Sequence, residues 1–192
     1  MSNLIRHRGG APHRPTPEPA TLEERLRAHL QQRFGRRSTN AQQCLLLDVS
    51  GSMLNGAGTG NSRIYELRQL ARRFPGTRRF IFSFADDCRE LAPEEDVPDA
   101  GGGTQLAEAL DYIKAHGILH AALISDGRPD NQAAALRSAA GLRLDIFYVG
   151  PPPEPEFLRQ LAQATGGSYG TASFTRTAEL ESRIKGLLTG GG

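Results

Sequence analysis

The sequence predicts an α/β fold with three layers, built as a doubly wound, mostly parallel six-stranded sheet with one antiparallel edge strand. Two observations predict this class. From residue 43 onward, short apolar runs of strand length alternate with segments whose apolar residues recur at helical spacing. Gly or Pro lies near most changes from one pattern to the next. This alternation is typical of a parallel sheet covered by helices on both faces.

The expected elements follow in order along the chain. An apolar run predicts a strand at 43–49, and Ile64, Leu67, Leu70 and Phe74 predict a helix at 62–74 that Pro75 ends. The next expected elements are a strand at 80–85, a tight turn at 86–87, a short edge strand at 88–91, a helix from 106 to 117 and a strand at 119–125. The last are a helix at 131–140, a strand at 144–149, a helix at 155–166, a strand at 168–172 and a helix at 178–188.

Length and composition favour one globular domain. The chain has 192 residues, of which 38% are hydrophobic and 23% charged, enough for one core of ordinary size. No apolar stretch reaches the length of a membrane span, and the first residues lack an apolar segment of signal-peptide length. With only two Cys, a disulfide scaffold is excluded, so we expect a cytoplasmic protein.

The domain boundaries follow from charge and proline content. Residues 1–40 carry eight Arg and three Glu, a net charge of +5 in a chain whose total is +2. We expect 1–20 to be a disordered, basic, Pro-rich arm and 21–39 to be an amphipathic helix and linker. The helix either packs back on the domain or docks a partner. The main domain spans 40–188, and 189–192 forms a flexible Gly tail.

Five oxygen-bearing side chains stand where these patterns place strand ends and a helix start. Asp48, Ser50 and Ser52 follow the first apolar run, Thr104 follows three glycines, and Asp126 ends a second apolar run. Ligands of open parallel sheets bind beyond the carboxyl ends of strands, so we expect these groups to converge. Two carboxylates and three hydroxyls make a hard donor set, which suits Mg²⁺ or Mn²⁺.

The DxSxS at 48–52, the distant Thr104 and the Asp-Gly at 126–127 resemble the metal-ion-dependent adhesion site (MIDAS) of von Willebrand factor type A (vWA) domains. The resemblance covers roughly residues 40–188 and is to the small intracellular bacterial type. It implies a Rossmann-like vWA fold in which Ser50 and Ser52 coordinate the cation directly. It also implies that Thr104 binds directly or through water, that Asp48 and Asp126 hold coordinated waters, and that a partner supplies a Glu or Asp as the last ligand.

The expected function is that of an intracellular adaptor, a divalent-metal-dependent protein interaction module. Family analogy names AAA+ ATPases and stress-response complexes as partners. The alternative is a nucleic-acid-associated protein or an accessory protein that uses its basic arm, although no aromatic residues accompany that arm and nucleic acid is therefore disfavoured. Truncation of residues 1–40 separates the two hypotheses.

An enzyme is not expected. The aspartyl phosphotransferase pattern needs an Asp where Ser50 stands, and the sequence has no GxSxG. His116 and His120 are predicted at the opposite pole of the sheet. Asn55 opens a glycine-rich segment that either forms an adaptable rim or is a plain linker. Arg128 either pairs with an incoming carboxylate or is a solvated surface residue, and Asp130 is expected to begin the next helix.

Overall fold

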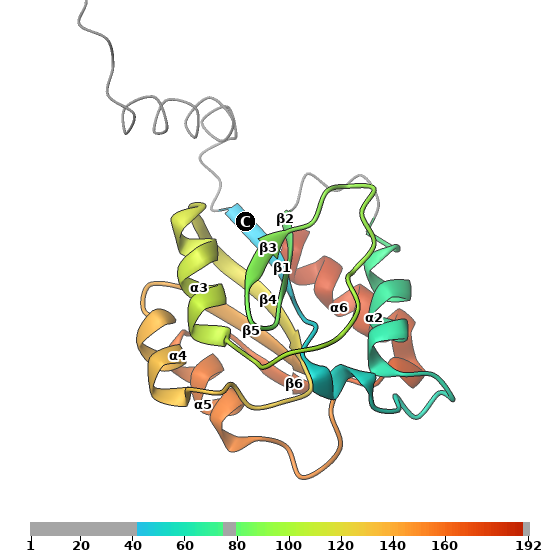
Figure 1. The fold of residues 1–192 in the computed structure, drawn as a ribbon. Helices are drawn as coiled ribbons and strands as arrows, with labels where there is room; N and C mark the ends of the chain where they lie inside the picture. The colour runs from blue at the N-terminus through green and yellow to red at the C-terminus, as the bar shows by residue number, and fades with distance from the viewer. Residues whose placement is uncertain (1–41, 75–79, 190–192) are drawn as a thin grey trace, which may run out of the picture. The chain divides into compact units, whose positions relative to one another are not determined.

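The computed structural model describes residues 42–74 and 80–189, which form a six-stranded sheet between two layers of helices (Figure 1). The strands are β1 (Gln42–Asp48), β2 (Phe80–Phe84), β3 (Cys88–Glu90), β4 (Ile118–Ser125), β5 (Arg143–Tyr148) and β6 (Tyr169–Thr171). They lie in the order β3-β2-β1-β4-β5-β6, and every neighbouring pair is parallel except β2 and β3. The predicted fold class, with its antiparallel edge strand, is confirmed.

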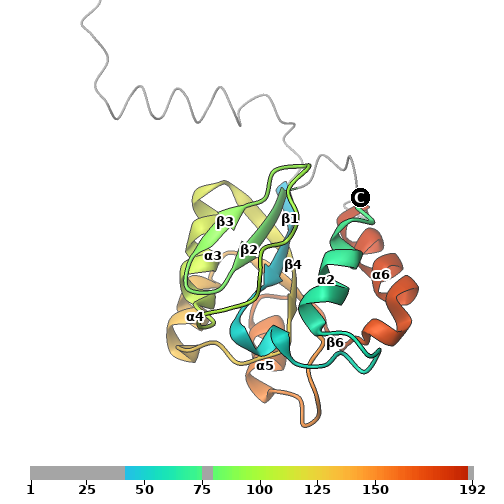
Figure 2. The ribbon, with the colours of Figure 1, turned by 45° about the vertical axis from the view of Figure 1, so that its right-hand side comes forward.

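Helices cover both faces of this sheet. They are α2 (Arg63–Ala71), α3 (Leu106–Ala115), α4 (Gln132–Ser138), α5 (Glu156–Ala164) and α6 (Thr177–Thr189), with 3₁₀ turns η1 (Gly51–Leu54) and η2 (Phe174–Arg176). Figure 1 and Figure 2 show α2 beside α6 on one face and α3, α4 and α5 on the other. None of these described helices combines the length and the apolar character that crossing a membrane requires.

The core explains why β1 and β4 read as continuous apolar runs. Both strands are central and buried on both faces, so neither shows the alternation of a half-exposed strand. The face toward α2 and α6 carries Leu45, Leu47, Ala122, Ile124 and Phe147. Because successive side chains point to opposite faces, the residues between them pack toward the other helix layer.

The structure differs from the sequence prediction mainly at the ends of elements. α2 ends at Ala71 and not at Phe74, and β6 has three residues where five were expected. The pattern does not predict η1 and η2, because three or four residues carry no periodic signal. The arm at 1–20 and the helix expected at 21–39 lie outside the described residues. Thr189, the predicted start of the tail, is the last residue of α6.

Candidate metal centre

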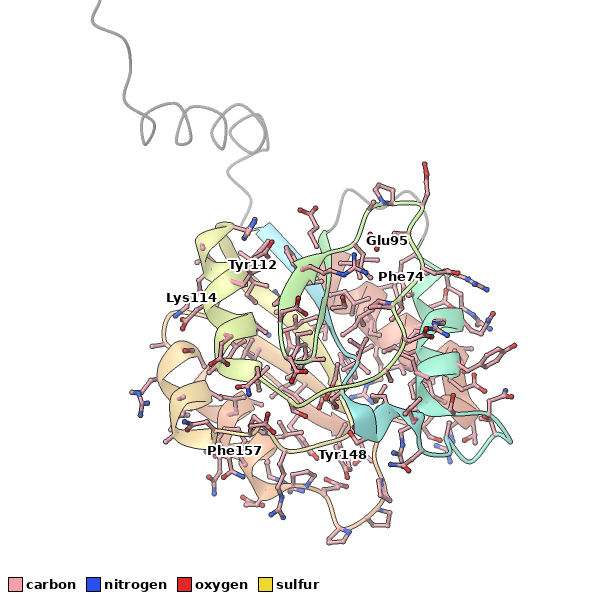
Figure 3. The ribbon with its side chains drawn as sticks, viewed as in Figure 1. Phe74, Glu95, Tyr112, Lys114, Tyr148 and Phe157 are labelled. Carbon is pink, nitrogen blue, oxygen red and sulfur yellow. The ribbon has the colours of Figure 1, made fainter. Side chains whose placement is uncertain are left out.

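The candidate site lies where the neighbouring strands β1 and β4 end. The two strands are parallel and in register, with Leu47 opposite Ile124, so Asp48 and Ser125 leave the sheet side by side. β1 continues into η1, while β4 continues into the loop that contains Asp126. The same end of the sheet carries the last residue of β5, Tyr148 (Figure 3).

The loop after β1 folds tightly around the first carboxylate. Asp48 is fully buried, its Oδ1 accepts a hydrogen bond from Ser50 N at 2.9 Å, and its Oδ2 accepts one from Ser125 Oγ at 2.5 Å. The η1 turn begins with Met53 N donating to Ser50 O, and the buried Met53 side chain anchors it. This turn places the hydroxyls of Ser50 and Ser52 3.1 Å apart.

Asp126 joins the two loops. Ser52 Oγ donates to Asp126 Oδ1 at 2.5 Å, across 74 residues of sequence. The other carboxylate oxygen, Oδ2, accepts a hydrogen bond from Arg63 Nη1 at 2.7 Å. The structure therefore brings Ser50, Ser52 and Asp126 into one hydrogen-bonded chain, and the backbone N–H of Ser50 connects that chain to Asp48.

Arg63 is the residue that the sequence analysis missed. It is 7% exposed, and its Nη1 also donates to Ser52 O at 3.2 Å. One signal in the sequence points to it. Arg63 lies four residues before Leu67, on the stripe of α2 that faces the core, where a cation is expected only if it has a buried partner.

Thr104 belongs to a third loop that lies against the other two. Gly51 N donates to Gly102 O at 3.1 Å, and Gly102 has φ of 71°, the left-handed region expected for this glycine run. Thr104 N donates to Asp130 Oδ2 at 2.9 Å, and Asp130 N donates back to Thr104 O. Within the described residues, no hydrogen bond joins the buried Thr104 hydroxyl to the other four candidate ligands.

Asp130 corrects one sequence prediction. It does not begin α4, because the side chain of Asn131 caps that helix by accepting from Ala134 N at 2.9 Å. The carboxylate of Asp130 instead holds the Thr104 loop in place. Asp86 supports the same loop from the end of β2, accepting from Gly103 N at 2.7 Å.

The two expected rim residues, Asn55 and Arg128, are both exposed. Asn55 opens a loop that backbone hydrogen bonds hold together, since Arg63 N donates to Asn55 O and Ala57 N donates to Asn61 O. Arg128 lies two residues after Asp126. The two histidines of the described chain lie away from this site. His120 lies near the first residue of β4, at the opposite end of that strand, and pairs with the buried Asp145.

Burial of the ionised carboxylates lowers the stability of the folded protein when no cation balances their charge. Burial raises the pKa of Asp48 from 3.8 to about 6, against the opposing effect of hydrogen bonds from Ser125 and Ser50, and the charge of Asp126 raises it further. Arg63 compensates only one of the two carboxylates. A cation at this point would supply the missing positive charge.

The donor set fits a hard divalent cation. Every candidate ligand atom is a carboxylate or hydroxyl oxygen, as Mg²⁺ and Mn²⁺ prefer. In the described part of the chain, no group of three His, Cys, Asp or Glu side chains is placed to hold a metal ion. The hydroxyls of Ser50 and Ser52 are therefore essential to any metal site here.

Solved structures share this architecture. An aerotolerance-related membrane protein from Bacteroides fragilis, studied with multiple mutations to serines, aligns with a TM-score of 0.58 and 17% identity over 78% of this chain and 99% of that one. A von Willebrand factor type A protein from Catenulispora acidiphila gives 0.58 and 19% identity over 77% of this chain and 42% of that one. The fold is that of a vWA domain.

A third vWA-fold neighbour has a metal in its MIDAS. Proximal thread matrix protein 1 from the mussel byssus, solved with zinc in that motif, aligns with a TM-score of 0.52 and 15% identity, over 79% of this chain and 46% of that one. No family model and no curated protein sequence matches the chain. At these identities the neighbours establish the vWA fold, and the argument for function rests on the site.

Proposed function

We propose that this protein is a divalent-cation-dependent interaction module that captures an acidic side chain of a partner protein. One observation carries the proposal: the adjacent hydroxyls of Ser50 and Ser52, one of them bonded to Asp126, form an oxygen-only cluster at the end of the sheet. The vWA fold and the zinc-occupied MIDAS of the mussel protein support it.

The residues have separate tasks in this proposal. Ser50 and Ser52 supply neutral direct ligands, Thr104 supplies a third hydroxyl, and Asp48 and Asp126 supply charge and hold coordinated waters. Because most direct ligands are neutral, a bound cation keeps its affinity for an outside oxygen anion. A Glu or Asp side chain of a partner is the natural last ligand, and Mg²⁺ or Mn²⁺ is the cation that these oxygens favour.

We propose binding and not catalysis at this site. Neither described histidine lies near it, and Arg63, the cation in contact with its carboxylates, is engaged with Asp126. The partner we propose is an intracellular protein with an accessible acidic side chain, in an AAA+ ATPase or stress-response assembly. Nucleic acid is not its proposed partner.

Metal binding by the full chain tests the proposal. Mg²⁺, Mn²⁺ and Zn²⁺ are titrated calorimetrically into wild type and into a Ser50→Ala/Ser52→Ala double variant. We expect one site in wild type and a loss of at least about tenfold in affinity in the variant, the scale seen when only a supporting group of a metal ligand is removed. The matched control is Ser173→Ala/Thr175→Ala, another hydroxyl pair two residues apart, 2.8 Å from each other but without a hydrogen-bonded carboxylate in the described structure.

Partner capture provides the second arm. Asp48→Ala is expected to abolish capture that depends on the metal. Equal metal affinity in wild type and the Ser50/Ser52 variant would contradict the proposed site. Capture that persists unchanged in EDTA would contradict the proposed mechanism.

A further inference from the structure

Arg63 occupies an unusual position for a residue next to a cation site. Its guanidinium contacts Asp126 Oδ2 at 2.7 Å and Ser52 O at 3.2 Å, and its side chain is 9% exposed. Asp126 Oδ1 is the oxygen that accepts the hydrogen bond from the Ser52 hydroxyl. A cation held by the Ser52 hydroxyl would therefore share Asp126 and Ser52 as neighbours with the guanidinium.

This contact changes the charge of the centre. Asp48 and Asp126 contribute two negative charges when ionised, and Arg63 contributes one positive charge, which leaves one negative charge. A divalent cation then gives the centre one net positive charge, and one partner carboxylate brings it to zero. Without Arg63, the same cation would neutralise the centre completely, and a partner carboxylate would leave it negative.

We infer that Arg63 sets the charge of the metal centre, weakening the binding of the cation itself and strengthening the binding of an anionic partner group to the loaded site. The inference rests on the proposed function and adds the reason for its preference for acidic partners. Salt screens the repulsion between a buried guanidinium and a bound cation only weakly. One buried guanidinium therefore has a large effect on the affinity for the cation.

A purely structural role for Arg63 predicts the opposite result. If the guanidinium only held Asp126 and the Ser52 carbonyl in position, its removal would disorder the ligands and weaken the binding of the cation. If it sets the charge, its removal tightens the binding of the cation and weakens the binding of the partner carboxylate. The sign of the change in metal affinity therefore separates the two roles.

The test uses the full chain and the variants Arg63→Gln, Arg63→Met and Arg63→Lys. Mn²⁺ affinity is measured by calorimetry, and acetate affinity at saturating Mn²⁺ is measured from the fall in water-proton relaxation as acetate displaces coordinated water. The control is Arg68→Gln, which removes an arginine of the same helix that binds Val97 O and Asp99. Circular dichroism establishes that each variant is folded.

We expect Arg63→Gln and Arg63→Met to bind Mn²⁺ at least about tenfold more tightly than wild type and acetate several-fold more weakly. Arg63→Lys, which keeps the charge, and Arg68→Gln should stay near wild type. Unchanged or weaker Mn²⁺ binding in whichever neutral variant folds overturns the inference. If neither neutral variant folds even with Mn²⁺, the role of Arg63 is structural and the inference also fails. Absence of Mn²⁺ binding in wild type itself would instead overturn the proposed function.

Discussion

Asp48→Asn should stabilise the protein in the absence of metal while removing its response to metal. Asp48 is fully buried, and its pKa is raised to about 6. Asn imitates the neutral acid and can keep the acceptor for Ser50 N. The Ser125 hydroxyl, which now donates to Asp48, can accept from the new amide and turn toward Gly127 O at 3.5 Å.

The magnitude follows from the pKa of Asp48. A rise from 3.8 to about 6 means that the ionised carboxylate costs the folded state about 3 kcal/mol at pH 7. The Asn amide replaces the hydrogen bond from the Ser125 hydroxyl with a less favourable one. We therefore expect a gain of about 1–3 kcal/mol in the free energy of unfolding, or roughly 2–12 °C in melting temperature.

The pH dependence gives this prediction a second measurement. The folded state has the higher pKa at Asp48, so it binds more protons than the unfolded state between pH 3.8 and about 6. The stability of the metal-free wild type should therefore fall as the pH rises through this window, relative to Asp48→Asn. The difference between the two proteins should be small near pH 3.5 and reach its full size above pH 7.

Urea denaturation in EDTA, at several pH values and then with Mg²⁺, measures both effects. The control is Asp87→Asn, which neutralises an exposed carboxylate after the neighbouring strand β2. The reasoning is refuted if Asp48→Asn lowers the metal-free stability at pH 7 by more than about 1 kcal/mol. It is also refuted if the variant retains the wild-type stabilisation by Mg²⁺.

Three further changes test the surroundings. Gly102→Ala should cost about 1–2 kcal/mol and weaken metal binding, because φ is 71° and the new Cβ would lie 2.2 Å from Asp86 Oδ2; urea denaturation and calorimetry measure these effects. Asp145→Ala should cost about 3 kcal/mol in urea and leave metal affinity unchanged, because it breaks a buried pair with His120 at the far end of the sheet. Burial tends to raise the pKa of Asp145, yet hydrogen bonds from Ser168 and His120 hold it below 3.8, so its contribution should be lost only as the pH falls below that value. Arg72→Ala, which removes an exposed ion pair, should leave the urea midpoint unchanged.

Local patterns were sufficient to predict the sheet and the positions of several site residues. Asp48 and Asp126 follow long apolar runs, and a parallel sheet brings the ends of such runs to one edge. The strand order of this sheet needs long-range pairing, which local periodicity does not contain. The order β3-β2-β1-β4-β5-β6 was therefore not predicted and is known only from the structure.

Residues that act through tertiary contacts could not be predicted in this way. The position of Arg63 on the core-facing stripe of α2 signals that it needs a buried partner, but it does not identify that partner as Asp126, 63 positions away. Asp130 looked like an acidic helix start because an Asp near a helix N-terminus usually is one. In the folded chain its carboxylate binds Thr104 N, a contact between loops that no local pattern specifies.

The sheet order explains why charge collects at this point. β1 and β4 are neighbours, but the chain leaves β1 for α2 on one face and leaves β4 for α4 on the other. The two loops therefore diverge, and the opening between them receives side chains from both. The same divergence brings the first turn of α2, with Arg63, against Asp126. A site at this switch point gains converging ligands because of the crossover, and it must also bury their charges at the centre of the sheet. The loss of stability that ionised Asp48 causes in the absence of metal thus follows from the buried position at which the ligands converge.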